Sequence, residues 1–385
     1  MDGDIGMDIR NDLDVKQSHD SNKYMDSYTD SDDDLKTYMF KKGAKIKVIG
    51  VGGGGNNTIN RVSEVGIRGA DTIAINTDAQ DLLYTTADKK ILIGKEISKG
   101  LGAGSQPKIG SEAAKESESE IKSNIRGSDL VFITCGLGGG TGSGAAPVVA
   151  DIAKKSGCLV VGIVTMPFAM EGAKRYENAV EALEKMENIV DTLIVIPNDK
   201  LLELAPDLPL QTAFKVADEI LTNAVKGIAE LVTRAGLVNL DFADIKTVMS
   251  GGGVALIGVG ESDSENRARE AVDKAINNPL LDVDITGATG ALINVSGGPD
   301  MTLDEARVIV EAVSEKLDPS ARIIWGAQIS DDLRSNIRAL LIVTGVQSTQ
   351  IFGRGRTQLS DNKRNKKENE LGIEFLDWVF DLKRS

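Results

Sequence analysis

The sequence predicts an α/β protein in which a parallel sheet covered by helices is joined by one long helix to a smaller mixed α/β domain. Apolar strand-like runs alternate with helical patterns from residue 45 onward, and two of these runs end in glycine-rich loops. A long helical pattern then separates this first set of elements from a second one. At 385 residues the chain is long enough for two such domains.

The first set of elements is typical of a Rossmann-like sheet, because its strands are separated by segments with helical periodicity, such as 57–66 and 176–187. Ligands of such sheets bind at the carboxyl ends of the strands, so we expect the functional site there. The predicted strands are 46–49, 72–75, 130–133, 159–164 and 193–196.

The long helix is predicted over about 212–233, where apolar residues recur at three- and four-residue spacing. At 1.5 Å per residue it is about 33 Å long, and its many apolar positions indicate burial between two bodies. The elements of the second set indicate a mixed α/β domain. They are strands at 254–259, 291–295, 322–325 and 339–343 and helices at 266–277 and 302–316.

Both ends of the chain differ in composition from its middle. Residues 1–36 carry eleven aspartates against four basic residues, which indicates a disordered acidic tail. The stretch after residue 352 is basic and polar, as expected for a flexible linker. The predicted divisions are a tail (1–40), a nucleotide-binding domain (41–211), the connecting helix (212–234), a C-terminal α/β domain (235–350), a linker (351–370) and a terminal segment (371–385).

Composition excludes several functions. The net charge of -14 argues against a nucleic-acid partner, and no run of eighteen apolar residues is present that would span a membrane. His19 is the only histidine, which disfavours Ser-His-Asp catalysis and histidine-ligated zinc. The first residues lack a secretory pattern, and Cys135 and Cys158 are too few for a disulfide framework. We therefore expect a cytoplasmic protein whose cysteines are small buried hydrophobes.

The first glycine loop, GVGGGGNN at 50–57, lies between a predicted strand and a predicted helix. It satisfies G-x-G-x-x-G, in which glycines let the backbone approach phosphate oxygens at a helix N-terminus. A dinucleotide-dependent dehydrogenase would also need an acidic residue about twenty positions later. The tip of the next strand is Asn76, with Asp78 slightly beyond, so this loop alone leaves that alternative open.

The second glycine loop, GLGGGTGSG at 136–144, also follows a strand and precedes a helix. Successive backbone N–H groups of such a loop form an anion nest, which the hydroxyls of Thr141 and Ser143 are placed to assist. The chain has no G-x-x-x-x-G-K-[ST], so the loop is not a P-loop. Two glycine loops at strand–helix junctions of one sheet predict a phosphate-binding site and disfavour the dehydrogenase.

At this point the sequence resembles a known family. GGGTGSG at 138–144 is similar to the signature of the tubulin/FtsZ family, and the resemblance covers about 44–350 and is greatest to archaeal members. It implies the tubulin/FtsZ fold and a GTPase that binds GTP and GDP with Mg²⁺, polymerises with itself and forms the cell-division ring. The further stretches that carry the resemblance are IKVIGVGGGGNNTINRV, AINTDAQDL, MPFAMEG, AFKVADE and NLDFAD.

The resemblance also implies which residues bind GTP. Glu171 and Arg175 would contact the ribose, Asp218 would accept hydrogen bonds from guanine, and Phe214 would stack on the base. From the residues alone, the first two equally fit an i,i+4 surface pair, and Asp218 fits a solvated helix face. In the first loop, the residues implied to line the phosphates and reach toward the base are Gly53, Gly54, Gly55, Asn56 and Asn57. In the second loop, those implied to hold the β- and γ-phosphates are Gly140, Thr141 and Gly142.

Asp241 and Asp244 follow the long helix and open another one. They fit a helix N-cap with its reinforcing acid, and their spacing also lets both carboxylates polarise one water. Lying at the far end of the long helix from Asp218, they cannot reach the chain's own nucleotide. We therefore expect them to act on a neighbour's nucleotide, in a head-to-tail contact that builds a filament. A structural relative that assembles without turnover remains an alternative, disfavoured by the presence of both carboxylates.

The terminal segment 371–385 can form a helix with an apolar stripe opposite acidic residues. An acidic face argues against direct membrane insertion and favours docking in a partner's groove. The resemblance implies that this partner is a membrane-anchoring division protein at mid-cell, and packing of the helix on the core is the alternative. The stripe consists of Leu371, Phe375, Trp378, Val379 and Leu382.

Overall fold

A computed structural model describes residues 44–345 apart from 68, 205–209, 234–240, 279, 281–284 and 286–287. The predictions for the acidic tail, the linker and the terminal segment lie outside the described residues, as does the side chain of Phe214. Among the described residues, no helix has the length and apolar character needed to cross a membrane.

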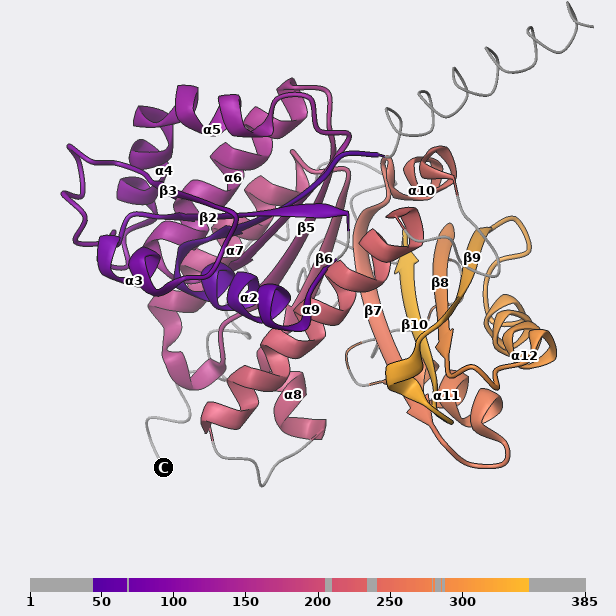
Figure 1. Ribbon diagram of the computed structural model, residues 1–385. Helices are drawn as coiled ribbons and strands as arrows, with labels where there is room; N and C mark the ends of the chain where they lie inside the picture. Colours follow the sequence, from indigo (N-terminus) through magenta and orange to yellow (C-terminus); the bar gives the residue numbers. More distant parts are fainter. Residues whose placement is uncertain are drawn as a thin grey trace, which may run out of the picture. The chain divides into compact units, whose positions relative to one another are not determined.

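The described strands form one ten-stranded sheet in the order β3-β2-β1-β4-β5-β6-β7-β10-β8-β9 (Figure 1). Neighbours from β3 to β7 pair in parallel, as do β8 and β9, whereas β10 is antiparallel to both of its neighbours. The parallel sheet expected from the sequence is therefore confirmed. The strands are β1 (Ile46–Val51), β2 (Ala70–Asn76), β3 (Lys89–Leu92), β4 (Leu130–Gly136), β5 (Leu159–Met166), β6 (Thr192–Pro197), β7 (Gly253–Ser262), β8 (Gly290–Gly297), β9 (Arg322–Ile329) and β10 (Ile337–Thr344).

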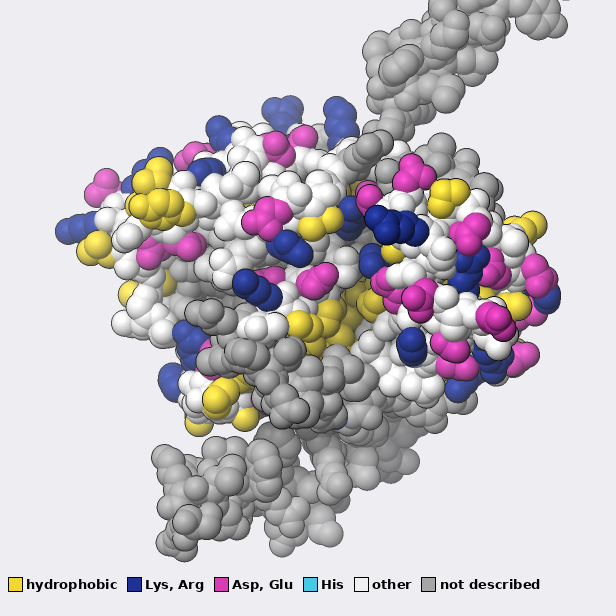
Figure 2. Space-filling view, turned by 60° about the horizontal axis from the view of Figure 1, so that its bottom comes forward, with side chains coloured by type: hydrophobic (Ala, Val, Ile, Leu, Met, Phe, Trp, Pro, Cys, Tyr) yellow, Lys and Arg dark blue, Asp and Glu magenta, His cyan; other side chains and the backbone are white. Residues whose placement is uncertain are grey.

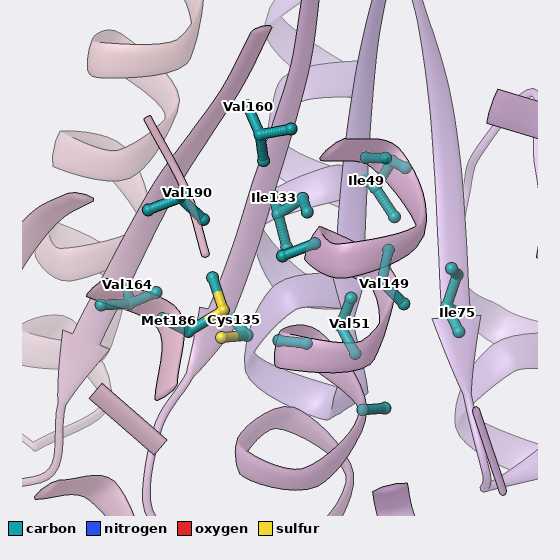
Figure 3. Packing of buried hydrophobic residues seen from close by; sticks show 14 of the residues in the cluster. Ile49, Val51, Ile75, Ile133, Cys135, Val149, Val160, Val164, Met186 and Val190 are labelled. Carbon is teal, nitrogen blue, oxygen red and sulfur yellow. The ribbon is translucent and has the colours of Figure 1, made fainter. Parts of the chain in front are cut away.

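Helices pack on both faces of the parallel strands, because successive strand residues point to opposite faces. Ile49 and Val51 of β1 belong to one buried apolar cluster (Figure 3), whereas Ile46 and Val48 belong to another that includes residues of α9. The helices are α2 (Gly52–Val65), α3 (Ala79–Tyr84), α4 (Pro107–Glu116), α5 (Glu118–Ile125), α6 (Gly140–Lys155), α7 (Ala173–Glu187), α8 (Asn198–Leu204), α9 (Leu210–Thr233), α10 (Phe242–Met249), α11 (Arg267–Ile276) and α12 (Leu303–Ser314), with 3₁₀ turns η1 (Ala169–Glu171) and η2 (Asp331–Leu333).

The long helix α9 is buried between the first strands and the last ones, as its apolar periodicity predicts. Leu221 and Ile228 belong to the same apolar cluster as Val48 of β1 and Leu340 of β10. Gly227 allows the close approach, because a Cβ there would lie 2.4 Å from the Cδ2 of Leu340. The sheet itself is continuous here, since β6 and β7 pair through three residues on each strand.

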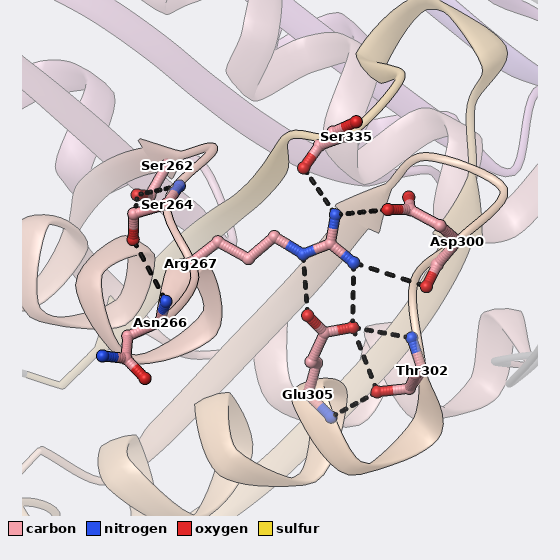
Figure 4. Close-up of polar contacts among 8 residues, drawn as sticks. All are labelled: Ser262, Ser264, Asn266, Arg267, Asp300, Thr302, Glu305 and Ser335. Atoms are coloured by element: carbon pink, nitrogen blue, oxygen red, sulfur yellow. Dashed lines mark hydrogen bonds and ion pairs between the residues drawn. The ribbon is translucent and has the colours of Figure 1, made fainter.

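One partly exposed arginine joins the segments at one end of the last four strands (Figure 4). Arg267, at the start of α11, donates Nε–H to Glu305 at 2.7 Å and a terminal N–H to Asp300 at 2.7 Å. A further bond of 2.5 Å reaches the carbonyl oxygen of Ser335. Glu305 also accepts the backbone N–H of Thr302, which caps α12. This charge-assisted network fixes the starts of α11 and α12 against each other.

The two cysteines are buried in the core, as expected from their apolar surroundings. Burial raises the pKa of the Cys135 thiol to about 12, which keeps it protonated and unreactive. Burial also raises the pKa of Cys158, whose Sγ donates to the carbonyl oxygen of Ser128 at 3.2 Å.

On the face drawn in Figure 2, acidic and basic side chains are interspersed.

Candidate functional site

A cavity of about 600 Å³ opens at the carboxyl ends of the parallel strands, where the sheet class predicts a ligand. Both glycine loops line it, together with residues from the segments after β2, β5 and β6 and from α9. The structure thus brings together residues that lie far apart in the sequence. The predicted residues on its wall are Gly53, Gly54, Asn57, Gly140, Thr141, Gly142, Glu171, Arg175 and Asp218.

A second cavity, of about 630 Å³, lies between α9 and the last strands. Its wall includes Glu219 and Lys226 of α9, Asn294 of β8 and Gln328 of β9. Neither glycine loop contributes to it. The geometry therefore assigns the predicted phosphate site to the first cavity.

The first glycine loop forms the opening turn of α2, which begins at Gly52 with a φ of 71°. Gly55 and Asn56 are buried and lie behind the cavity wall, which differs from the expectation that they line the phosphates. The reason is packing against β4, because a Cβ at Gly55 would lie 2.4 Å from the carbonyl oxygen of Thr134. Gly55 therefore lets α2 approach the sheet.

Two glycines on the cavity wall have no such packing role. A Cβ at Gly53 would meet nothing nearer than an oxygen of Asp81 at 4.0 Å, and a Cβ at Gly139 would meet nothing within 4 Å. Neither residue has a positive φ. A methyl group at either position would meet open space rather than packed protein. These glycines therefore suit a ligand that approaches the backbone closely.

The second glycine loop forms the opening turn of α6, so both loops present helix N-termini to the cavity. Backbone N–H groups and the helix dipole favour an anion there. Thr141 lines the cavity, and its hydroxyl lies 2.6 Å from that of Thr77. Ser143 departs from the expectation, because its buried hydroxyl accepts the N–H of Gly138 at 2.8 Å and holds the loop itself.

Glu171 and Arg175 form an ion pair one helical turn apart on the cavity wall. The other carboxylate oxygen of Glu171 accepts the backbone N–H of Phe168 at 3.0 Å, which orients this side chain in η1. The surface-pair interpretation and the ligand-contact interpretation are therefore compatible. Arg175 is the one basic side chain on the part of this wall that the structure describes.

Asp218 lies on α9 at the other end of the same cavity, beside Ala217 and Leu221. Burial raises the pKa of its carboxyl to about 6, because desolvation disfavours the charged form. Asn198, at the start of α8, shares this wall, and its buried Oδ1 has no partner among the described residues. A desolvated carboxylate and a partnerless amide oxygen on one wall suit a ligand that presents N–H groups. Sequence reasoning missed Asn198, whose only signal is its position directly after a strand.

The segment before α4 forms a wall that the sequence did not predict. Residues 101–105 line the cavity, and the N–H of Gly102 donates to the carbonyl of Thr77 at 3.1 Å. The segment has positive φ at Lys99 and Ser105 as well as at glycines, so it has no periodicity to detect. It packs on the second loop, since a Cβ at Gly140 would lie 2.8 Å from that of Ala103.

Asp241 and Asp244 do not line this cavity. Asp241 occupies the N-cap position of α10, and Asp244 accepts its N–H at 3.3 Å, so the predicted capping arrangement is present. Both side chains are exposed. The part of α9 from Asp218 to Thr233 alone spans about 22 Å. Within one chain, the two carboxylates are therefore remote from the glycine loops.

The fold and this cavity, with two helix N-termini and a half-buried carboxylate on its wall, define a nucleotide-binding α/β protein. The Tubulin/FtsZ family GTPase domain model matches residues 45–206, and the FtsZ family C-terminal domain model matches 253–347. The chain belongs to the Tubulin/FtsZ family, carries its GTPase domain and binds GTP and GDP. The fold and the family that the sequence resemblance implied are thereby confirmed.

Individual relatives agree over most of their length. The chain is 60% identical to Cell division protein FtsZ 1 of Methanocaldococcus jannaschii, covering 88% of this chain and 92% of that protein. It is 54% identical to Cell division protein FtsZ of Methanothermobacter thermautotrophicus, covering 95% and 98%. A solved structure titled FtsZ dimer, empty, from M. jannaschii superposes with a TM-score of 0.81 at 59% identity, over 88% of this chain and 99% of that one.

Proposed function

We propose that this GTPase polymerises head to tail and hydrolyses GTP between successive subunits, as the filament of a cell-division ring at mid-cell. The observation that carries the proposal is the separation of Asp241 and Asp244 from the glycine-loop cavity. Asp241 and Asp244 lie at the exposed start of α10, whereas the nucleotide binds at the other end of α9. A neighbouring subunit must therefore supply the carboxylates that act on each nucleotide. The names of the relatives, which are cell division proteins, support the cellular role.

The base pocket favours guanine in this proposal. Guanine N1 and N2 carry two donors that the carboxylate of Asp218 can accept, and the partnerless oxygen of Asn198 offers a further acceptor. Adenine has no N–H at N1 and no amino group at C2. Stacking of Phe214 on the base remains a prediction of the family resemblance, because that side chain lies outside the description.

The glycine loops bind the phosphates and the Glu171–Arg175 pair contacts the ribose. Gly53 and Gly139 leave room for phosphate oxygens, and Thr141 with the N-terminus of α6 faces the β- and γ-phosphates. The described residues contain no cluster of three or more side chains of the kind that could hold a metal ion. Mg²⁺ fits a site made mainly of phosphate oxygens, with one carboxylate from the wall. Asp78 lies on this wall and could supply the carboxylate, and Mg²⁺ bound there would neutralise phosphate charge.

Hydrolysis follows when the start of α10 of one subunit meets the open cavity of the next. Asp241 and Asp244 then orient and deprotonate the water that attacks the γ-phosphorus, while the bond from this phosphorus to the β–γ bridging oxygen breaks and GDP leaves. A contact between two different faces that does not close into a ring extends into a filament. The terminal segment 371–385 attaches this filament to a membrane-anchoring division protein.

Phosphate release measured against protein concentration tests the proposal. Activity per subunit should rise from near zero as filaments form, because a lone subunit holds GTP without the carboxylates that act on it. Sedimentation of the same samples reports the polymer. Constant activity per subunit at concentrations without polymer would show that hydrolysis takes place within one chain.

A further inference from the structure

Asp81 is an acidic side chain in a place where an anionic ligand binds. It lies on α3, half-buried on the wall of the glycine-loop cavity. One of its oxygens is 4.0 Å from the point where a Cβ of Gly53 would lie. A carboxylate beside phosphates opposes their binding by charge, so its presence there requires another reason.

The hydrogen bonds of Asp81 supply that reason. Its Oδ2 accepts the side-chain N–H of Asn76 at 2.6 Å and that of Asn56 at 3.1 Å. Asn56 belongs to the first glycine loop, and Asn76 ends β2. One carboxylate oxygen accepts two amide donors, and its negative charge makes both bonds stronger than those to the oxygen of a neutral amide.

The contact determines how Asn56 is oriented. With its amide nitrogen directed at Asp81, its Oδ1 is left buried and without a partner. An unsatisfied buried oxygen is energetically unfavourable. The opposite orientation would place this oxygen against the carboxylate, so Asp81 selects the observed one.

From Asn76 the connection continues to the second glycine loop. The Oδ1 of Asn76 accepts the backbone N–H of Thr77 at 2.8 Å, and the hydroxyl of Thr77 lies 2.6 Å from that of Thr141. Asp81 therefore stands at the centre of a hydrogen-bonded chain that links the first loop, the end of β2 and the second loop.

We propose that Asp81 is a positioning residue for the phosphate end of the cavity, holding the two glycine loops in one fixed relation through Asn56, Asn76 and Thr77. It does not contact the reacting atoms. This inference rests on the proposed function, because it takes the cavity to bind the phosphates of GTP. Its effect is on affinity, since the catalytic carboxylates belong to another subunit.

The test compares Asp81→Ala with Asp88→Ala in the full chain. Asp88 is a matched control: its Oδ2 also accepts two bonds, from the N–H and the hydroxyl of Thr72 at 2.8 Å each, but it lies off the cavity wall. Both variants should lose similar thermal stability. Only Asp81→Ala should weaken binding of fluorescent GDP and GTP, by roughly ten- to hundredfold, because displaced binding groups lose alignment.

Asp81→Asn provides a second measurement that does not depend on the alanine variant folding. Its amide oxygen, in the place of Oδ2, accepts both amides without the carboxylate's negative charge, so its affinity should fall between those of the unaltered chain and Asp81→Ala. At saturating GTP, turnover per polymerised subunit should stay within about twofold of the unaltered chain, with the loss confined to KM.

Affinity of Asp81→Ala within twofold of the unaltered chain would overturn the inference. Tighter nucleotide binding by both Asp81→Ala and Asp81→Asn would also overturn the inference, since Asp81 would then act only as a repelling charge. If the unaltered chain itself binds no guanine nucleotide, the proposed function fails, and this outcome is distinct from either of the others.

Discussion

Gly55 lies so close to Thr134 that a Cβ on the glycine would be 2.4 Å from the threonine's carbonyl oxygen. This approach brings the start of α2 onto β4 and so places the first glycine loop at the edge of the cavity. Two positions earlier, Gly53 has open space instead. Gly55 thus allows close packing, whereas Gly53 leaves space for a ligand, and substituting each glycine alone tests the two roles separately.

Gly53→Ala should fold normally and lose nucleotide binding. The methyl group meets no protein atom closer than 4.0 Å, and alanine favours the helix by up to about 1 kcal/mol. It occupies cavity space, so we expect affinity for GTP to fall at least tenfold by fluorescence titration. Gly55→Ala is the contrast: overpacking against Thr134 should destabilise the fold by about 1–3 kcal/mol in urea denaturation. Full GTP affinity in Gly53→Ala would contradict close phosphate approach at this glycine.

Asp218→Asn should stabilise the nucleotide-free protein near pH 7. Because burial raises the pKa of Asp218 to about 6, the folded state binds more protons than the unfolded state between about pH 4 and 6. The carboxylate's contribution to stability therefore falls as pH rises through this window. The asparagine variant does not lose stability as pH rises through this window. Its free energy of unfolding should therefore exceed that of the unaltered chain by about 1–2 kcal/mol at pH 7 and by less at pH 4.

The same substitution should lower the preference for GTP over ATP, since an amide nitrogen would face guanine's donors. Glu219→Gln removes a neighbouring charge that does not line this cavity and should change neither property. Thermal unfolding across pH and competition binding with both nucleotides measure the two effects. An unchanged GTP preference in Asp218→Asn would remove this residue from base recognition.

Asp244→Ala should bind GTP and polymerise but release little phosphate, giving filaments that persist. It also loses one capping bond, worth about 1 kcal/mol. Thr302→Ala loses a comparable cap, on α12, and serves as the control for that effect. Mixed with Asp218→Ala, Asp244→Ala should regain activity, because the intact cavity of one chain meets the intact carboxylates of the other. No gain in the equimolar mixture would argue against a shared site.

Removal of residues 353–385 should leave GTP binding and filament formation intact, because the composition of the linker predicts no contact with the core. Recruitment to the division site in cells should be lost. Fluorescence microscopy of the truncated and full-length chains checks this expectation. Normal localisation of the truncated chain would mean that the terminal segment is not the docking element.

Local pattern and backbone chemistry were sufficient to predict much of this protein. The apolar runs predicted the parallel strands, and glycine runs between a strand and a helix predicted phosphate-binding helix starts. The capping position of Asp241 followed from its place before a helix. These features depend on residues within one or two turns of each other, and so they are visible in sequence.

Other features depend on which distant segments meet. Ser143 turns inward to Gly138, residues 101–105 form a wall without any periodic pattern, and Asn198 joins the base end of the cavity. Asp81 receives two amides that come from α2 and from β2, which only the packing of α3 beside both makes possible. Sequence alone determined the fold class and the glycine loops because these follow from short-range backbone geometry. The tertiary structure alone decided which polar side chains face the ligand and which face each other, because that depends on long-range packing.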